Sequence, residues 1–213
     1  MIRLVDGFKI RNTLDDDFGI FHRFSNKLSW FAPKFYIPEG ESWLDYRYEA
    51  EQDFLTAVED FVPPLGLAYA EERKLILEKL GAPGDLPDFK VAAEEIDGLK
   101  VFAVDGAVVR RYLDPGFILG GHDLVYDYVP KGEIWLDKHM DPAERKYILH
   151  HEVVEQKLMS EGKSYDVAHD FATASDKELR RQDGTSYPGD DDPPFAWRHL
   201  SDEEIIAKYY VTK

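Results

Sequence analysis

The sequence lacks several features, and each absence excludes a class of protein. It has no cysteine, which excludes disulfides, thiolate metal ligands and a catalytic thiol. No apolar run approaches the roughly 18 residues of a membrane helix. The start, MIRLVDGFKI, does not have the charged-then-apolar layout of a secretory signal. We therefore expect a cytoplasmic protein that makes no membrane contacts.

Basic residues are also scarce. Against 42 Asp and Glu there are 26 Lys and Arg, so the net charge is −16. Nucleic acid and anionic membranes repel such a chain, so nucleic acid is not an expected partner. An acidic interaction protein that mimics nucleic acid is one alternative, but the acidic residues are scattered rather than arrayed. Apolar residues make up 44% of the chain, which is enough for a sizeable core.

What the sequence does contain is an internal repeat. Residues 2–18 (IRLVDGFKIRNTLDDDF) and 101–117 (VFAVDGAVVRRYLDPGF) share a V-D-G…R…L-D…F pattern. Residues 36–45 (YIPEGESWLD) and 128–137 (YVPKGEIWLD) then match in the same order. Two collinear matches that contain the rare Trp favour a duplicated unit of roughly 60 residues.

Local signals predict the elements of each unit. Asp-Gly between apolar runs, at 6–7 and 105–106, predicts a β-hairpin. The E-x-W-L-D segments predict a short strand, and a helix follows in both copies, over about 47–62 and 141–160. We expect an α+β fold of two related hairpin–strand–helix units, the second with a zincin-like active helix and an antiparallel partner helix.

Four segments are expected along the chain. They are a first repeat unit without metal ligands (1–64), a connecting helix and linker (65–98), a second repeat unit with the metal site (99–181), and a loop with a C-terminal helix (182–213). Trp43/Trp135 and Asp45/Asp137 occur in both units, so we interpret them as structural. Residues found only in the second unit are the candidates for chemistry.

The second unit alone carries a cluster of metal-binding residue types. His151-Glu152-x-x-Glu155 lies on the helix predicted over 141–160, whose Asp-Pro-x-Glu start is a strong capping signal. Residues four apart share a helix face, so His151 and Glu155 can reach one ion. Glu152 points about 100° away, as the general base does in HExxH zinc sites.

His169 is the expected third ligand. Residues from Tyr165 to about Arg181 predict a second helix, joined to the first by a short turn. At ~1.5 Å per residue, Glu155 and His169 each lie roughly 7.5 Å from that turn, so they are level on antiparallel helices. Two histidines and one carboxylate leave a coordination position for water. Tyr165 lies one turn before His169 and faces the same way.

Other interpretations of these residues stay open. Glu155 can instead face solvent, with His151 a hydrogen-bonded core histidine. His150 points about 100° from His151 and is a surface or supporting group. The dipeptide His169-Asp170 also occurs in helical metal-dependent phosphohydrolases, which need more ligands. Residues 120–122 (Gly-Gly-His) predict a bulge or turn, or a place where backbone lines a cleft.

HExxE on a helix that follows the strand EIWLD and precedes a histidine-bearing helix resembles the zincin metallopeptidase superfamily. The HE-x-x-E…Y-x-x-AH arrangement is similar, more closely, to small uncharacterised bacterial and phage proteins. The resemblance covers roughly residues 100–181. It implies zinc bound by His151, Glu155 and His169, with Glu152 activating water for peptide hydrolysis. It also implies that part of 117–137 is an edge strand that holds an extended substrate.

The order of the ligands departs from the usual zincin pattern. Glu155 stands where the second His is usual, and His169 stands where a Glu is usual, so manganese or iron is an alternative to zinc. We expect a metal-dependent hydrolase, above all a zinc peptidase acting on a peptide or protein, with Glu152 and Tyr165 as catalytic residues. The alternative is a catalytically inactive zincin-like module that binds metal or a partner.

Overall fold

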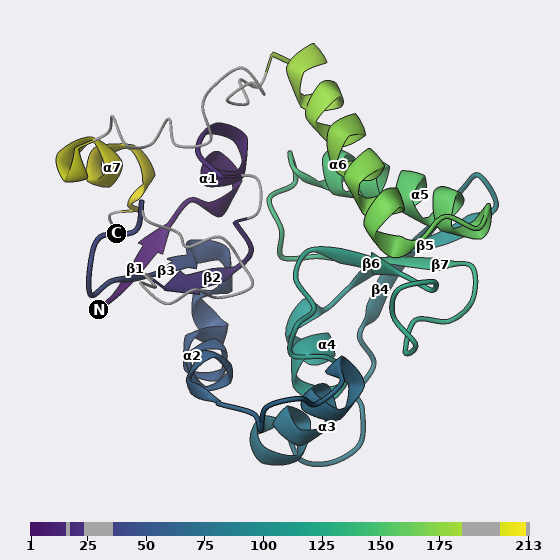
Figure 1. The fold of residues 1–213 in the computed structure, drawn as a ribbon, viewed down its shortest axis with the longest axis horizontal. Coiled ribbons are helices and arrows are strands. Elements are labelled where there is room, and N and C mark those ends of the chain that lie inside the picture. Colours follow the sequence, from purple (N-terminus) through teal and green to yellow (C-terminus); the bar gives the residue numbers. More distant parts are fainter. Residues whose placement is uncertain (16–17, 24–35, 185–200, 212–213) are drawn as a thin grey trace. The chain divides into compact units, whose positions relative to one another are not determined.

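The computed structural model describes residues 1–15, 18–23, 36–184 and 201–211 (Figure 1). Over these ranges the chain is α+β, with α-helices and two small mixed sheets in two compact units. Unit 1 comprises Met1–Gln52 and Arg180–Lys213, and unit 2 comprises Asp53–Leu179. Most of the loop predicted after residue 182 lies outside the described residues.

Unit 1 is built on a three-stranded sheet of order β1-β3-β2, in which β1 is parallel and β2 antiparallel to β3. Its elements are β1 (Ile2–Val5), α1 (Gly7–Thr13), β2 (Phe21–Arg23), β3 (Ser42–Asp45), the 3-10 helix η1 (Tyr46–Glu51) and α7 (Asp202–Tyr209). Helix α7 begins with a capping box, which Ser201 and Glu204 form. Helix α7 completes the core, because Ile205 and Tyr209 pack beside Trp43.

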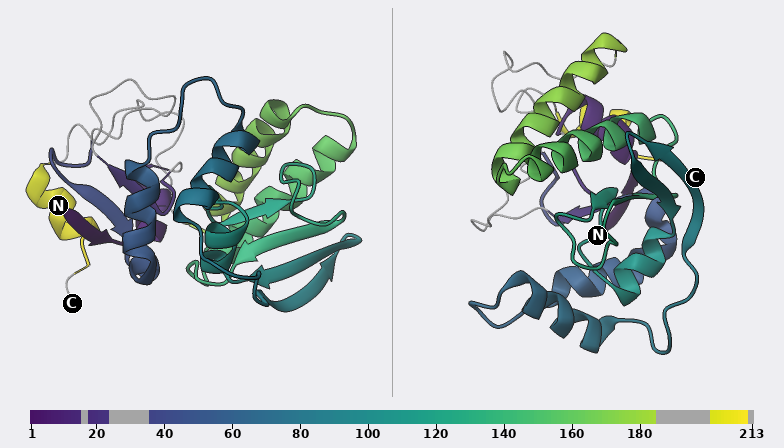
Figure 2. Two further views of the ribbon diagram at one scale, coloured as in Figure 1. Left: turned by 90° about the horizontal axis from the view of Figure 1, so that it is seen from below. Right: turned by 90° about the vertical axis from the view of Figure 1, so that its right-hand side faces the viewer.

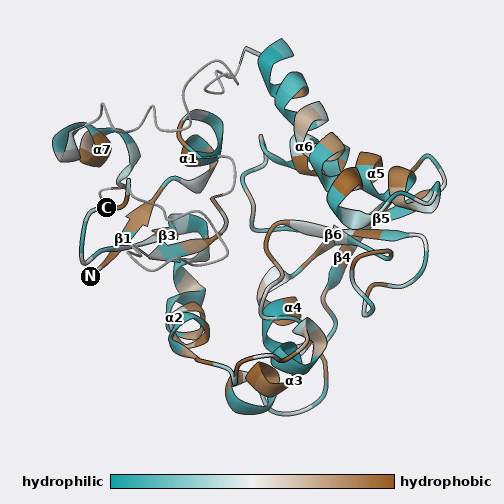
Figure 3. Ribbon diagram, viewed as in Figure 1, coloured by the Kyte–Doolittle hydropathy of each residue, from teal (hydrophilic) through white to brown (hydrophobic). Residues whose placement is uncertain are grey.

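Unit 2 is built on a four-stranded sheet of order β4-β5-β7-β6, in which β5 and β7 are parallel. Its elements are α2 (Gln52–Asp60), α3 (Tyr69–Leu80), β4 (Lys90–Ile96), β5 (Leu99–Val104), α4 (Gly106–Tyr112), β6 (Gly120–His122), β7 (Glu133–Asp137), α5 (Arg145–Ser160) and α6 (Tyr165–Gln182). Its core gathers around Trp135. The helices carry both hydrophilic and hydrophobic residues, as amphipathic helices do (Figure 3).

The Asp-Gly pairs at 6–7 and 105–106 do not form hairpins, so this part of the sequence prediction is wrong. Asp6 and Asp105 are instead the N-cap residues of α1 and α4, and the Asp6 carboxylate accepts the amide of Lys9 at 3.3 Å. A short carboxylate can accept a backbone N–H in a turn or at a helix start, so the dipeptide does not discriminate between them. The strand before each helix pairs in parallel not with the next strand of the chain but with the one after it, β1 with β3 and β5 with β7.

The hairpin of unit 2 lies at Asp97-Gly98, where the sequence prediction placed only a connecting helix and linker over 65–98. Asp97 has φ 52° and Gly98 has φ 82°, which are the two positive values that a type I′ turn requires. The turn joins β4 to β5 in antiparallel register. Strand β4 is exposed along most of its length, so it had no alternation of apolar and polar residues to reveal it.

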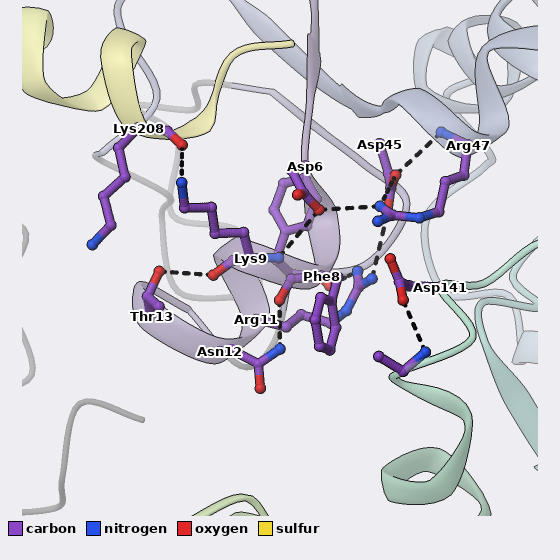
Figure 4. A network of polar contacts seen from close by, with 12 residues as sticks. Asp6, Phe8, Lys9, Arg11, Asn12, Thr13, Asp45, Arg47, Asp141 and Lys208 are labelled. Carbon is purple, nitrogen blue, oxygen red and sulfur yellow. Dashed lines mark hydrogen bonds and ion pairs between the residues drawn. The ribbon is translucent and has the colours of Figure 1, made fainter. Parts of the chain in front are cut away.

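Each unit holds a buried Asp–Arg pair beneath the helix that follows its repeated Asp-Gly, which is α1 in unit 1 and α4 in unit 2; Asp45 also accepts from Arg47 at 2.9 Å. In unit 1, Arg11 Nη2 lies 3.4 Å from Asp45 Oδ2 (Figure 4), and in unit 2, Arg110 Nη1 donates to Asp137 Oδ2 at 2.9 Å. Each guanidinium also donates to two backbone carbonyls of the following loop, those of Phe18 and Gly19 in unit 1 and of Phe117 and Ile118 in unit 2. The four ionic side chains of the two buried pairs are at most 3% exposed.

The glycine of each helical Asp-Gly pair is explained by this ion pair. A Cβ at Gly7 would lie 2.2 Å from Asp45 Oδ2, and a Cβ at Gly106 would lie 1.9 Å from Asp137 Oδ2. The buried carboxylate therefore occupies the space that any other residue would need. A close approach, rather than a turn, requires glycine at these two positions.

The helices predicted around the HExxE motif are found, with one difference at the first start. Helix α5 ends at Ser160, and Gly162 reverses the chain with φ 92°. Helix α5 begins at Arg145 rather than at 141, because Asp141 Oδ1 accepts the amide of Ala143 and closes a separate turn (Figure 4).

Across the ranges that the structure describes, no helix combines the length and apolar character of a membrane span.

Candidate metal centre

Helices α5 and α6 lie side by side and antiparallel, and α5 packs on β6 and β7 (Figure 2). Three contacts along the pair fix this register: His150 with Ser175, His151 with Asp176, and Glu155 with His169. Glu155 and His169 are therefore level on the two helices, at the position that the count from the turn predicts.

The side chains of His151, Glu155 and His169 converge on one point. His169 Nδ1 lies 2.7 Å from Glu155 Oε2 and 3.2 Å from His151 Nε2, and His151 Nε2 lies 3.5 Å from Glu155 Oε2. Ligand atoms placed tetrahedrally around zinc, at bonds of about 2.0–2.1 Å, are ~3.3 Å apart. The three observed separations are close to this value, so small side-chain movements suffice to admit an ion of that size.

Asp176 fixes which nitrogen of His151 faces this point. Its Oδ2 lies 3.1 Å from His151 Nδ1. An ionised carboxylate only accepts hydrogen bonds, so Nδ1 carries a proton and Nε2 is the nitrogen that faces Glu155 and His169. A carboxylate behind a ligating histidine is the usual support in metal sites. Asp176 was not predicted from the sequence, although it lies seven residues, about two helical turns, beyond His169.

His122 is a second residue whose place in the site was not predicted from the sequence. It ends β6, is fully buried, and places Nε2 3.0 Å from Glu155 Oε1. Its Nδ1 accepts the amide of Leu124 at 3.2 Å. No spacing rule connects a strand residue to a helix residue so far along the chain. A comparison of the two units could have indicated it. Arg23 in β2 holds the register position that His122 holds in β6, so the histidine occurs at this position in the second unit and not in the first.

Glu152 is buried beside the three converging side chains and has no hydrogen-bond partner among the described residues. It is 9% exposed, and the backbone of Gly120 approaches it so closely that a Cβ there would lie 2.9 Å from Glu152 Oε1. Burial raises the pKa of Glu152 from its ordinary 4.5 to about 7. A carboxylate with a pKa near neutrality is well matched to accept a proton from water.

The charges of the converging side chains favour binding of a cation. Burial opposes the ionisation of Glu155, but hydrogen bonds from His122, His151 and His169 lower its pKa well below the usual range. Burial likewise opposes the protonation of His151, but Asp176 and Glu155 together raise its pKa to about 10. In the metal-free protein a proton on His151 thus balances Glu155, and a divalent ion binds by displacing that proton.

Tyr165 stacks on His169, with the ring centroids 5.3 Å apart and the planes at 25°. It is 46% exposed, so it lies at the rim of the site. Burial of the rest of the side chain raises the pKa of its hydroxyl to about 12. The tyrosine therefore faces the site in its neutral form, which can donate a hydrogen bond.

The remaining candidates lie elsewhere. His150 points away from the three converging side chains and lies 2.6 Å from Ser175 Oγ. Asp170 is exposed on α6, so it does not complete the ligand set that an HD-type phosphohydrolase needs. No protein-family model, curated protein or solved structure matches this chain. The resemblance to zincins therefore rests on the motif alone.

Proposed function

We propose that unit 2 is a metal-dependent hydrolase, and that it is a zinc peptidase. One observation carries the proposal: three ligand atoms with near-tetrahedral separations lie beside a buried carboxylate that has no hydrogen-bond partner among the described residues. His151, Glu155 and His169 would hold the ion. When bound, a divalent cation polarises a carbonyl and makes water more acidic. The peptide as substrate is taken from the resemblance.

The proposed roles of the other residues follow from their positions. Glu152 accepts the proton of the attacking water and passes it to the leaving amine, because it is buried and its pKa lies near 7. Asp176 holds His151 in the tautomer that leaves Nε2 available. Tyr165, half-exposed at the rim, donates a hydrogen bond to the substrate.

The first experiment tests the metal ligands. The purified protein is analysed for bound metals by mass spectrometry, and His151→Ala is compared with His150→Ala, a histidine on the same helix that faces Ser175 instead. We expect zinc in the wild type and in His150→Ala, and its loss in His151→Ala. Equal metal content in both variants would exclude His151 as a ligand.

The second experiment tests the base. Cleavage of a fluorescently labelled unfolded protein, such as casein, is measured for Glu152→Gln and for Glu161→Gln, which alters an exposed glutamate at the end of the same helix. Glu152→Gln should keep its zinc and lose activity by a factor of about 100 or more, whereas Glu161→Gln should resemble the wild type. Cleavage that persists in Glu152→Gln would remove Glu152 as the base.

A metal-binding module without catalysis is the second candidate. It is favoured by the fact that the same side chains join α5 to α6, so an ion there would hold the helical hairpin together. A chelator that lowers the melting temperature, with metal present but no cleavage of any peptide tested, would favour this function over the peptidase.

We infer in addition that the two units descend from one duplicated segment. The repeated sequence blocks and the buried Asp–Arg pair in each unit support this inference. On this view the first copy kept the scaffold only, and the second copy acquired the long helices that carry the candidate ligands.

A further inference from the structure

Each oxygen of the Glu155 carboxylate has its own neighbours. Oε2 faces His151 and His169, the two histidines with which it would share an ion, whereas Oε1 faces His122. Glu155 and His122 are both buried, at 3% and 0% exposure. The two oxygens of this one candidate ligand are therefore in different surroundings, and His122 accounts for the difference.

The hydrogen bonds of His122 fix its tautomer. Its Nδ1 accepts the Leu124 amide, and a nitrogen that accepts a hydrogen bond carries no proton. In the neutral imidazole the proton is then on Nε2, from which it is donated to Glu155 Oε1 at 3.0 Å. Both nitrogens are thus committed, one to the backbone of the β6–β7 loop and one to the carboxylate.

This tautomer also decides the role of a second group of residues. His122, Glu152 and Glu155 offer ligand atoms within 4.8 Å of one another, which is a spacing compatible with another ion. A neutral His122 with its proton on Nε2 has no lone pair to direct at such an ion. The second group is therefore part of the support of the first site, and Glu152 stays available as a base.

We propose that His122 is a positioning residue that keeps Glu155 a one-oxygen ligand and thereby favours four-coordinate zinc over manganese or iron. The inference rests on the proposed function, because it concerns the same ion. With Oε1 bound to His122 and Oε2 facing the ion, the protein supplies three ligand atoms, and one open position completes a tetrahedron. Manganese and iron(II) favour a larger, near-octahedral set, to which a two-oxygen carboxylate would contribute.

The test uses cobalt(II), whose visible absorption is strong in tetrahedral and weak in six-coordinate sites. The full chain is loaded with cobalt as wild type, as His122→Gln, which keeps an N–H donor, and as His122→Leu, which removes it. We expect strong absorption from the wild type and His122→Gln, and weaker absorption from His122→Leu. The preference for zinc over manganese should fall about 10- to 100-fold in His122→Leu. His150→Leu is the matched control and should resemble the wild type.

Each outcome bears on a different statement. A His122→Leu protein with the wild-type cobalt spectrum and metal preference would overturn the role of His122 but leave the zinc hydrolase intact. A wild-type protein that takes up neither cobalt nor zinc would overturn the proposed function, and this inference with it.

NMR of the imidazole nitrogens in the zinc-loaded wild type supplies a test that needs no variant. A proton on His122 Nε2 supports the proposal, and a proton on Nδ1 refutes it.

Discussion

Unit 1 and unit 2 bury the same kind of ion pair but continue differently after it. In both, a strand, a short helix capped by Asp, an antiparallel strand and a final strand ending in Leu-Asp follow in the same order. After Asp45 the chain continues into η1 and α2, whereas after Asp137 it continues into the longer α5 and α6. The candidate site lies on side chains of unit 2 that differ from those at the matching positions of unit 1 or lie beyond the repeated blocks.

The difference separates two kinds of residue. Asp45 and Asp137 hold the arginine that organises each sheet, so their presence in both units reflects the scaffold. His122 lies at the register position that Arg23 holds in β2, and His151, Glu155 and His169 lie on α5 and α6, beyond the repeated blocks. Comparing the units therefore identifies the chemistry more directly than the motif does.

The largest effect is expected from breaking one ion pair at a time. Arg110→Met leaves Asp137 buried without its cation, which typically costs about 3–5 kcal/mol of unfolding free energy. Hydrogen exchange followed by mass spectrometry should show the loss of protection in unit 2, together with loss of bound metal. Arg11→Met should lower protection in unit 1 and leave metal binding unchanged. If both variants lost metal equally, metal binding by unit 2 would depend on the ion pair of unit 1, and the two units would not be independent.

The next effect concerns Glu152, the buried carboxylate beside the candidate ligands. The raised pKa of Glu152 means that its protonated form stabilises the fold fully below pH 4.5, and that this contribution is lost as the pH rises through about 7. In chelator, Glu152→Gln should therefore be more stable than wild type at pH 8, by about 3 kcal/mol, and equal to it near pH 4. Urea unfolding at the two pH values measures this.

The exposed Glu161 supplies the control for that measurement. Glu161→Gln should change the unfolding free energy by less than about 0.5 kcal/mol at either pH, as surface substitutions usually do. A stability gain for Glu152→Gln that is the same at pH 4 and pH 8 would show that titration of Glu152 is not its cause.

A smaller effect is expected where glycine meets the buried aspartate. Gly106→Ala and Gly7→Ala each insert a methyl group against a buried carboxylate, and overpacking of this kind costs about 1–3 kcal/mol. The two variants should lower the unfolding free energy by similar amounts, because the contacts are alike. A large cost in one unit and none in the other would show that the aspartates are not held in the same way.

The smallest effect is expected at Asp97-Gly98, an Asp-Gly pair that does form a turn. Gly98 has φ 82°, and a Cβ added there would meet nothing within 4 Å, so Gly98→Ala brings backbone strain without a clash. Its expected cost is about 1 kcal/mol by thermal unfolding. A cost as large as that of Gly106→Ala would mean that the Asp-Gly pairs at 97–98 and 105–106 are not distinguished by their surroundings.

The sequence predicted those features that depend on residues near one another in the chain. The connecting helix within 65–98, the helix pair on either side of Gly162 and the E-x-W-L-D strands are found because periodicity, caps and glycine act locally. The level placement of Glu155 and His169 also required only counting from a turn. For such features, the number of residues between two positions is enough to predict how far apart they lie in the structure.

Features that depend on distant residues were not predictable in this way. The role of each Asp-Gly pair is decided by a carboxylate roughly 30 or more residues later, so the dipeptide alone favoured the wrong structure at 6–7 and 105–106. His122 reaches Glu155 only after β6 has paired with β7 and α5 has packed on both. Strand β4 was missed because exposed residues on both of its faces remove the period of two.

The place of α7 has a consequence for how the protein is made. Unit 2 is a continuous stretch of chain, whereas unit 1 is completed by α7 and the residues after it, where Tyr209, Tyr210 and Val211 contact Asp6, Val5 and Leu4. A ribosome therefore synthesises every residue of unit 2 before it reaches the segment that completes unit 1. The N-terminal sheet cannot bury its apolar face against that segment until the segment has been made.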